Sequence, residues 1–165
     1  MYRKILVPLD GSHRSEKILP HVEALAKRYG AKVIFLKVVR YPRLNAYNGL
    51  EFDTYRKNCD AVMERARSQL NLLTGEFREK VIDAEYRVTS GPIVSEIVDM
   101  AVREDVDLIT MSSHGRSGLR RVFYGSVAAG VLHQIDRPIL MIRSLGSKKQ
   151  DWNPDRKQPD SICFI

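Results

Sequence analysis

The feature of this sequence that most limits its fold is a regular alternation of short aliphatic runs with stretches of helical periodicity. Nearly continuous aliphatic runs, such as residues 4–10 and 32–39, are typical of strands buried on both faces of a sheet. Between such runs, apolar residues recur every three to four positions, as on the buried face of a helix. Strands that alternate with helices are joined by crossovers, which place the strands parallel to one another. The pattern therefore predicts an open α/β domain.

The same pattern sets the limits of the expected elements. Five strands are expected, over residues 4–10, 32–39, 81–88, 107–111 and 138–142. Four helices are expected, over residues 15–29, 55–73, 91–104 and 127–135. Gly30 and Gly75 are expected to end the first two helices, and Pro20 predicts either a late start or a kink in the first. We expect a three-layer open sandwich whose five parallel strands lie in the order 3-2-1-4-5.

Length and composition indicate one globular domain followed by a polar tail. Residues 1–143 of the 165 hold all the periodic segments, whereas residues 144–165 are polar apart from a short apolar end. We therefore expect a domain over 1–143 and a tail that is flexible or associated with a dimer. The net charge of +7 is scattered and partly carried by the tail, and no nucleic-acid recognition motif accompanies it. Nucleic acid is not an expected partner.

The cysteines and the N-terminus favour the cytoplasm. Cys59 and Cys163 form neither a CxxC pair nor a disulfide framework, which suits a reducing compartment. The apolar run Ile5-Leu6-Val7 is too short for a signal peptide and stops at Pro8. No stretch approaches the ~20 apolar residues of a membrane-spanning helix. We expect a cytoplasmic protein that makes no membrane contact.

Two loops that follow expected strands carry residues suited to anion binding. Pro8-Leu9-Asp10-Gly11-Ser12 ends the first strand, and Met111 to Gly118 follows the fourth strand, ahead of a helix that opens at Gly125-Ser126. Backbone N–H groups in small-residue loops and at helix starts favour phosphate. In open parallel sheets, ligands bind outside the C-terminal ends of the strands, where the strand order reverses. With the order 3-2-1-4-5, both loops face one crevice, so the sequence predicts one anion site there.

The sequence lacks the motifs of several well-known classes of nucleotide-binding protein and enzyme. There is no G-x-x-x-x-G-K-[ST], no G-x-G-x-x-G, no H-E-x-x-H and no G-x-S-x-G. Neither a metal cluster nor a catalytic triad is expected, and Asp10 and His114 are the candidate reactive groups. We therefore expect no dedicated catalysis, and at most slow turnover of a bound nucleotide.

Taken together, these loops resemble the universal stress protein family over roughly residues 2–143. The resemblance lies in Val7-Pro8-Leu9-Asp10-Gly11-Ser12, in the helix start at Gly91-Pro92, in Ser113-His114-Gly115-Arg116-Ser117-Gly118 and in Gly125-Ser126. The ATP-binding branch of that family carries a glycine, two residues, a second glycine, nine residues, then glycine and serine or threonine. Gly115, the nine residues 116–124 and Gly125-Ser126 match this pattern, whereas Ser112 replaces the first glycine. Serine adds a polar group where glycine lets the backbone approach a ligand closely.

The resemblance implies a fold like that of the adenine nucleotide α-hydrolases and a site for ATP with Mg²⁺ or Mn²⁺. Asp10 would hold a ribose hydroxyl or help to place the cation, and Met111 would lie against the sugar and base. The adenine slot would be formed by Pro8, Leu9 and Val38. The triphosphate would be wrapped by Gly115, Arg116, Gly125, Ser126 and Val127. Ser112, His114 and Gly118 complete the nucleotide-binding set that the resemblance implies.

Simpler interpretations of the same residues stay open from sequence alone. Asp10 and Ser126 are also ordinary helix-capping residues. His114 is either a hydrogen-bonding loop residue or a catalytic base, and Val38 is a core residue unless the resemblance holds.

The sequence thus favours one function and leaves two alternatives. The favoured function is a cytoplasmic ATP-binding universal stress protein, with a regulatory role in the stress response and little or no turnover. It would form a homodimer through the edge strand Ile139–Ile142. One alternative is a slow ATP hydrolase or an ATP-dependent transferase of a related fold. The other is a dimeric interaction protein that binds no nucleotide, in which Ser112 would mark the loss of binding.

Overall fold

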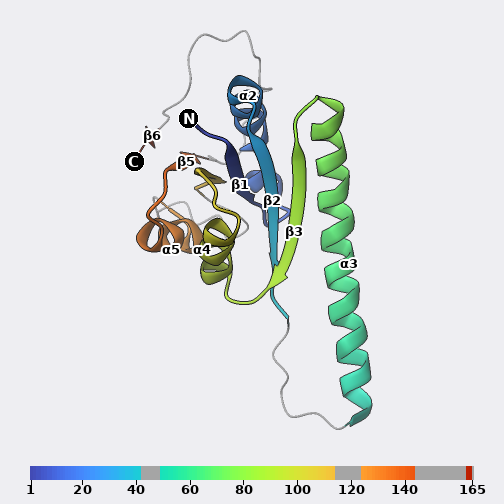
Figure 1. The fold of residues 1–165 in the computed structure, drawn as a ribbon. Helices are drawn as coiled ribbons and strands as arrows, with labels where there is room; N and C mark the ends of the chain where they lie inside the picture. Colours follow the sequence, from blue (N-terminus) through green and yellow to red (C-terminus); the bar gives the residue numbers. More distant parts are fainter. Residues whose placement is uncertain (42–48, 114–123, 144–162, 165) are drawn as a thin grey trace.

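Five parallel strands form the centre of the sheet in this computed structural model, which describes residues 1–41, 49–113, 124–143 and 163–164 (Figure 1). The strands lie in the order β3-β2-β1-β4-β5-β6, so the predicted order 3-2-1-4-5 of the parallel strands is confirmed. The parallel strands are β1 (Lys4–Pro8), β2 (Lys32–Val39), β3 (Ala84–Ser90), β4 (Leu108–Ser112) and β5 (Ile139–Ile142). The two-residue strand β6 (Cys163–Phe164) pairs antiparallel with β5.

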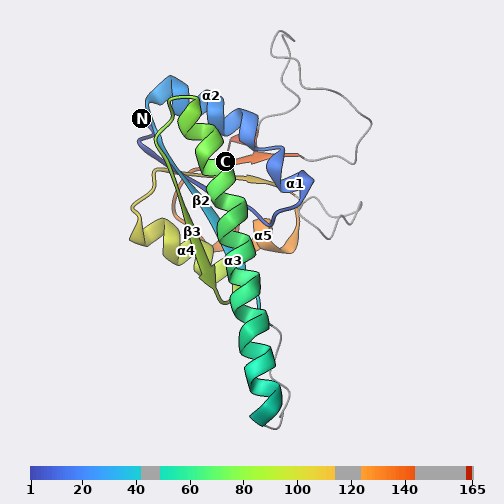
Figure 2. The same cartoon turned by 90° about the vertical axis from the view of Figure 1, so that its right-hand side faces the viewer.

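Helices cover both faces of this sheet. They are α1 (His13–Glu16), α2 (Leu19–Tyr29), α3 (Gly49–Glu79), α4 (Ile93–Arg103) and α5 (Ser126–Gln134). The two views place α2 and α3 on one side of the sheet and α4 and α5 on the other (Figures 1 and 2). The molecule is therefore the three-layer open sandwich that the sequence predicts. Within the described residues, no helix is long and apolar enough to cross a membrane.

Alternate side chains of the strands supply two separate cores. Ile5 and Val7 of β1 pack with residues of α2 and α3, such as Val22 and Phe77. Leu6 of β1 points to the other face and packs in a second cluster with residues of α4 and α5. This arrangement explains why the strand sequences are almost continuously aliphatic, since both faces of each central strand are buried.

The first predicted helix is divided in two at Pro20. α1 ends at Glu16 and α2 begins at Leu19, with Pro20 in the first turn of α2. Proline is well tolerated there because its missing N–H would have no partner inside the helix. The predicted late start is therefore what the structure has, and Gly30 ends α2 in the left-handed conformation at φ +61°.

The predicted end of α3 at Gly75 is wrong. α3 continues through Gly75 to Glu79 and begins at Gly49, so it is longer at both ends than the expected 55–73. Thr74 and Phe77 on either side of Gly75 are 1% and 2% exposed. A glycine inside a helix costs only about 1 kcal/mol relative to alanine, and burial of Phe77 outweighs that cost. Figure 1 shows the N-terminal part of α3 extending past the C-terminal ends of β2 and β3.

The third strand begins three residues later than expected. Val81 is 93% exposed, and its N–H donates to the carbonyl of Arg78 at 2.9 Å, so it belongs to the turn that closes α3. Its positive φ of 62° also takes it out of the extended conformation of a strand. β3 itself lies at the edge of the sheet, as expected.

Candidate functional site

The turn after β1 is shaped by Asp10, Gly11 and Ser12. The Asp10 Oδ1 accepts the N–H of Ser12 at 2.8 Å, a side-chain turn typical of aspartate. Gly11 adopts φ +76°, a conformation that glycine accepts without strain. Ser12 then caps α1 by accepting the N–H of Ser15 at 3.2 Å. Asp10 is therefore not the cap of this helix, and its carboxylate is held at the end of β1 by the turn instead.

The end of β4 is tied both to β5 and to the start of α5. The N–H of Ser113 donates to the carbonyl of Ile142 at 2.8 Å, and the carbonyl of Ser113 accepts the N–H of Gly125 at 2.7 Å. This second bond brings the two ends of the predicted phosphate loop together. Four of the predicted contacts, His114, Gly115, Arg116 and Gly118, lie outside the described residues.

The start of α5 faces the same region with its backbone N–H groups. Gly125 is the N-cap of α5, and no side chain caps this helix end within the described part of the chain. Ser126 is thus the first residue of the helix rather than its cap, which removes the plain capping interpretation. The first N–H groups of a helix have no partner inside the helix, and the helix dipole adds positive potential there. This end of α5 can therefore accept an anion.

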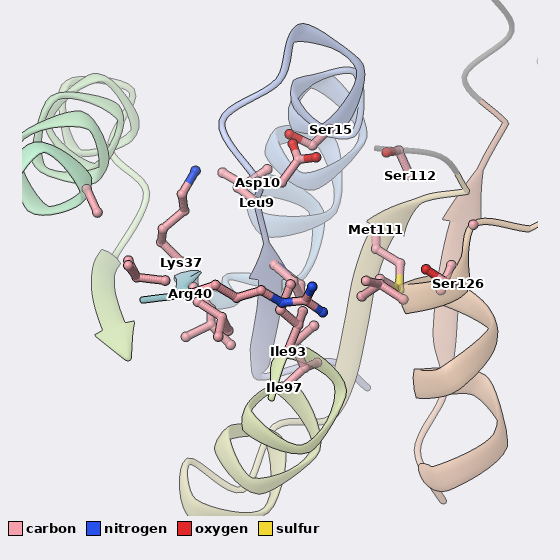
Figure 3. Close-up of a pocket in the computed structure, with 18 of the residues that line it drawn as sticks. Leu9, Asp10, Ser15, Lys37, Arg40, Ile93, Ile97, Met111, Ser112 and Ser126 are labelled. Carbon is pink, nitrogen blue, oxygen red and sulfur yellow. The ribbon is translucent and has the colours of Figure 1, made fainter. Parts of the chain in front are cut away.

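These elements surround one pocket with a volume of about 590 Å³ (Figure 3). It lies at the C-terminal ends of β1 and β4, where the chain leaves the sheet toward opposite faces, through α2 after β1 and α5 after β4. Nine predicted contacts fall within the described residues, and every one of them lines this pocket: Pro8, Leu9, Asp10, Val38, Met111, Ser112, Gly125, Ser126 and Val127. A volume in the range of ~300–1,000 Å³ is usual for sites that hold a small molecule.

The pocket combines an apolar slot with polar ends. Leu9 and Met111 are 6% and 5% exposed and contribute apolar surface next to Val38. Ile93 and Ile97 of α4 close the slot from below, as Figure 3 shows. Asp10 lies at one border, and Ser126 lies at another. Such a slot suits a planar apolar group that carries polar substituents at its edges.

Sequence reasoning missed a second group of pocket residues. α3 contributes Val62, Arg65, Ala66 and Gln69, and β2 and its end contribute Lys37 and Arg40. Lys37 and Arg40 flank the predicted Val38, so their nearness along the chain was an available signal. No local signal marks the α3 residues, because their place depends on how α3 crosses the sheet.

Among the described lining residues, the cations outnumber the acids. Lys37, Arg40 and Arg65 are the positive side chains, and Asp10 is the carboxylate. No cluster of three or more potential metal ligands occurs in the described part of the chain. The chemistry available to these residues is therefore the binding of an anionic ligand, with one carboxylate to accept hydrogen bonds or contact a cation.

Fold and pocket together define an open α/β protein with a ligand crevice at its topological switch point. A profile of the universal stress protein family matches residues 1–143, and the chain belongs to this family. Universal stress protein MJ0577 of Methanocaldococcus jannaschii is 30% identical over 161 residues, covering 89% of this chain and 98% of the relative. The solved structure of MJ0577 matches with a TM-score of 0.77 at 28% identity and covers 89% of this chain and 99% of that one.

Two further solved structures resemble the fold and contain nucleotides. A universal stress protein in complex with cAMP has a TM-score of 0.56 at 21% identity, covering 87% of this chain and 98% of that one. The universal stress protein from Archaeoglobus fulgidus in complex with dAMP has a TM-score of 0.58 at 20% identity, covering 85% and 97%. At this level of identity the likeness concerns the fold.

Proposed function

We propose that this chain binds ATP in the pocket between β1 and β4 and acts as a cytoplasmic regulatory protein of the stress response. The observation that carries the proposal is the convergence of nine predicted nucleotide contacts, from four elements, on one pocket of about 590 Å³. Family members with this fold hold cAMP and dAMP, which have an adenine base, a sugar and phosphate in common with ATP.

Each part of the nucleotide has a matching part of the pocket. The adenine lies in the apolar slot of Leu9, Val38 and Met111, where removal from water favours a flat aromatic ring. The ribose hydroxyls donate to the carboxylate of Asp10, and the phosphates lie at the N–H groups of Ser126 and Val127. This orientation places the negative charge at the positive end of the helix dipole.

The serine at position 112 is compatible with this arrangement. Ser112 is the last residue of β4 and pairs in register with Ile142 of β5. It is not among the described residues with positive φ, so its backbone conformation does not require glycine. Replacing the family's glycine by serine therefore costs no backbone strain, and the effect on the nucleotide is limited to one small hydroxymethyl group.

The residues present also fit a divalent cation bound together with the phosphates. Mg²⁺ prefers oxygen ligands and is commonly held by one or two carboxylates together with substrate phosphates. Asp10 is the carboxylate among the described lining residues, its turn with Ser12 holds it in place, and contact with the cation is the alternative to its contact with the ribose. Such a cation would neutralise part of the phosphate charge. Mg²⁺ or Mn²⁺ is therefore part of the proposal.

The direct test is to denature the purified protein, identify any released nucleotide, and measure ATP affinity by calorimetry. We expect ATP or ADP in the released fraction and measurable ATP binding. Absence of both would contradict the proposal and favour an interaction protein that binds no nucleotide. Rapid ATP turnover that disappears in His114→Ala would instead favour an enzyme of a related fold.

Replacing Gly125 by valine tests where the phosphates bind. The Gly125→Val isopropyl group would stand beside the first N–H groups of α5, while the backbone bond from Gly125 to Ser113 can persist. We expect at least a tenfold loss of ATP affinity with an unchanged circular dichroism spectrum. Gly75→Ala is the matched control, because Gly75 has open space around it and lies outside the pocket. Unchanged affinity in Gly125→Val would mean that the phosphates lie elsewhere.

We also propose that the protein forms a homodimer through β5. β5 (Ile139–Ile142) is the second strand from one edge of the sheet, and its four residues are all apolar. Beyond β5 the sheet continues only with the two residues of β6, within the described part of the chain. A partner strand can pair with this edge where β6 does not cover it.

A further inference from the structure

The pocket has a cationic side that the ATP proposal does not use. Lys37 and Arg40 extend from β2, and Arg65 extends from α3. In the sheet order, β2 lies on one side of β1, and β4, which leads to α5, lies on the other. The three cations therefore enter the pocket from the side opposite to the start of α5, as Figure 3 shows for Lys37, Arg40 and Ser126.

The Lys37 Nζ and the Gln69 Oε1 both lie near Gly11, in the turn that carries Asp10. A Cβ atom placed on Gly11 would lie 2.6 Å from the Lys37 Nζ and 3.5 Å from the Gln69 Oε1. The ammonium group of Lys37 is thus next to the turn that holds the proposed ribose-binding carboxylate. Arg65 and Gln69 are four residues apart on α3, so they lie on the same face of the helix, one turn from each other.

Arg65 differs from the neighbouring arginine of the same helix. Arg67 pairs with Glu64 at 3.6 Å, whereas Arg65 has no ion pair or hydrogen bond within the described residues. Arg65 lines the pocket, and Arg67 does not. Like charges that gather in a concave site raise the local positive potential and attract anions from solution. A guanidinium group with five N–H donors is well suited to phosphate.

We propose that Lys37, Arg65 and Gln69 form a second anion subsite, for a phosphate on the 3′ side of the ribose. This inference rests on the proposed function, in which Asp10 accepts a ribose hydroxyl and the 5′-phosphates lie at the start of α5. A group attached to the 3′-oxygen then leaves the sugar toward the side where Lys37 stands next to Asp10. The ligand class is a nucleotide with phosphates on both sides of the nucleoside, either a 3′,5′-bisphosphate or a dinucleotide linked through the 3′-oxygen.

Asp10 works against a second phosphate at this place, because both groups are negative. Two cations, Lys37 and Arg65, oppose this single carboxylate on the same side of the pocket, and the polar side chain of Gln69 lies beside them. The balance of charge on this side is therefore positive. Both α3 side chains are exposed at the rim, which keeps the gain modest because solvent and salt screen it.

The experiment compares ADP with adenosine 3′,5′-bisphosphate, which has the same number of phosphates in a different arrangement. Calorimetry of the full chain is expected to give about tenfold tighter binding of the bisphosphate, the low end for charge-assisted hydrogen bonds. Arg65→Ala should abolish this preference, because it removes a guanidinium group from the 3′-phosphate that ADP lacks. Arg67→Ala is the control and should keep the preference. Raising the salt concentration should reduce the preference in the unmodified protein.

The outcomes separate this inference from the proposed function. If ADP binds and the bisphosphate binds no tighter, the subsite does not exist and the ATP site stands. A preference that survives in Arg65→Ala also overturns the subsite as assigned. If neither ligand binds, both proposals fail together. A dinucleotide that binds more tightly than the bisphosphate would identify the second nucleoside as part of the ligand, with the subsite retained.

Discussion

At the scale of single residues, Gly11 combines a conformational and a steric requirement at the rim of the pocket. Its φ of +76° lies in the left-handed region, and an added Cβ would come within 2.6 Å of the Lys37 Nζ. Left-handed backbone costs an L-residue roughly 1–2 kcal/mol. The lysine ammonium would also have to move from the turn.

Gly11→Ala is therefore expected to destabilise the protein by about 1–2 kcal/mol, which is a fall in Tm of roughly 2–8 °C for a chain of this size. Gly75→Ala provides the opposite sign, because Gly75 is inside α3 with open space around it and alanine is favoured there by about 1 kcal/mol. Thermal unfolding followed by circular dichroism measures both. An unchanged Tm in Gly11→Ala would show that this turn adapts to a side chain.

Single residues also show what the sequence can predict of the site. Pro8, Asp10, Met111 and Ser126 are recognisable because they stand next to strand ends and a helix start within short local motifs. Arg65 and Gln69 reach the same pocket from the middle of a long helix. Their contribution depends on the angle and position at which α3 packs on β2 and β3, and no residue near them in sequence encodes that geometry.

At the scale of elements, long-range packing decides whether a glycine ends a helix. Gly30 ends α2 in the left-handed conformation, and β2 begins two residues later, where Val33 is fully buried as part of the strand. Gly75 does not end α3, since Phe77 beyond it is buried against Phe35 with ring centroids 5.0 Å apart. The same residue type therefore gives opposite results, and only the tertiary contacts distinguish them.

Strand order was predictable, because few topologies join five alternating strands and helices without crossings.

The start of β1 is joined to β4 by one carboxylate. Asp107 accepts the backbone N–H of Arg3 at 2.7 Å and that of Lys4 at 2.8 Å. Burial pushes the pKa of Asp107 upward, but the two backbone N–H bonds and the charge of Arg3 outweigh it and lower the pKa below its usual value. A carboxyl whose pKa is lower in the folded state stabilises the fold above its unfolded pKa of about 4, and this stabilisation is lost as the pH falls through the folded pKa.

Asp107→Asn should therefore cost about 1.5–3 kcal/mol of unfolding free energy at pH 7, the value of hydrogen bonds to a charged group. The difference from the unmodified protein should shrink below a pH of about 4, where the aspartate itself becomes protonated. Urea unfolding at neutral and acidic pH measures this. Asp105→Asn is the control: its side chain is 78% exposed, and its ion pair with Arg137 is of the weak surface type. An equal loss at both pH values would mean that the charge of Asp107 does not matter.

At the scale of the whole molecule, the edge beyond β5 decides how two copies can meet. Leu140 and Met141 pair with Phe164 and Cys163 of the same chain. A β5 strand from a second copy would need the same backbone groups at these positions, so β6 and a partner strand compete for one edge. The sequence did not predict this pairing, because two residues far from β5 give no periodic signal.

Deleting residues 163–165 should therefore strengthen the proposed dimer. The truncation uncovers the N–H and C=O groups of Met141, which face away from β4 because Pro138 and Ile142 on either side bond to β4, and this makes pairing with a second copy more favourable. We expect the midpoint of the monomer–dimer equilibrium, measured by analytical ultracentrifugation, to move to lower protein concentration than in the full chain. The nucleotide pocket lies at the ends of β1 and β4, so ATP affinity should not change and serves as the internal control. A dimer that weakens on truncation would mean that β6 contributes to the interface instead of competing with it, and an unchanged midpoint would place the dimer interface away from β5.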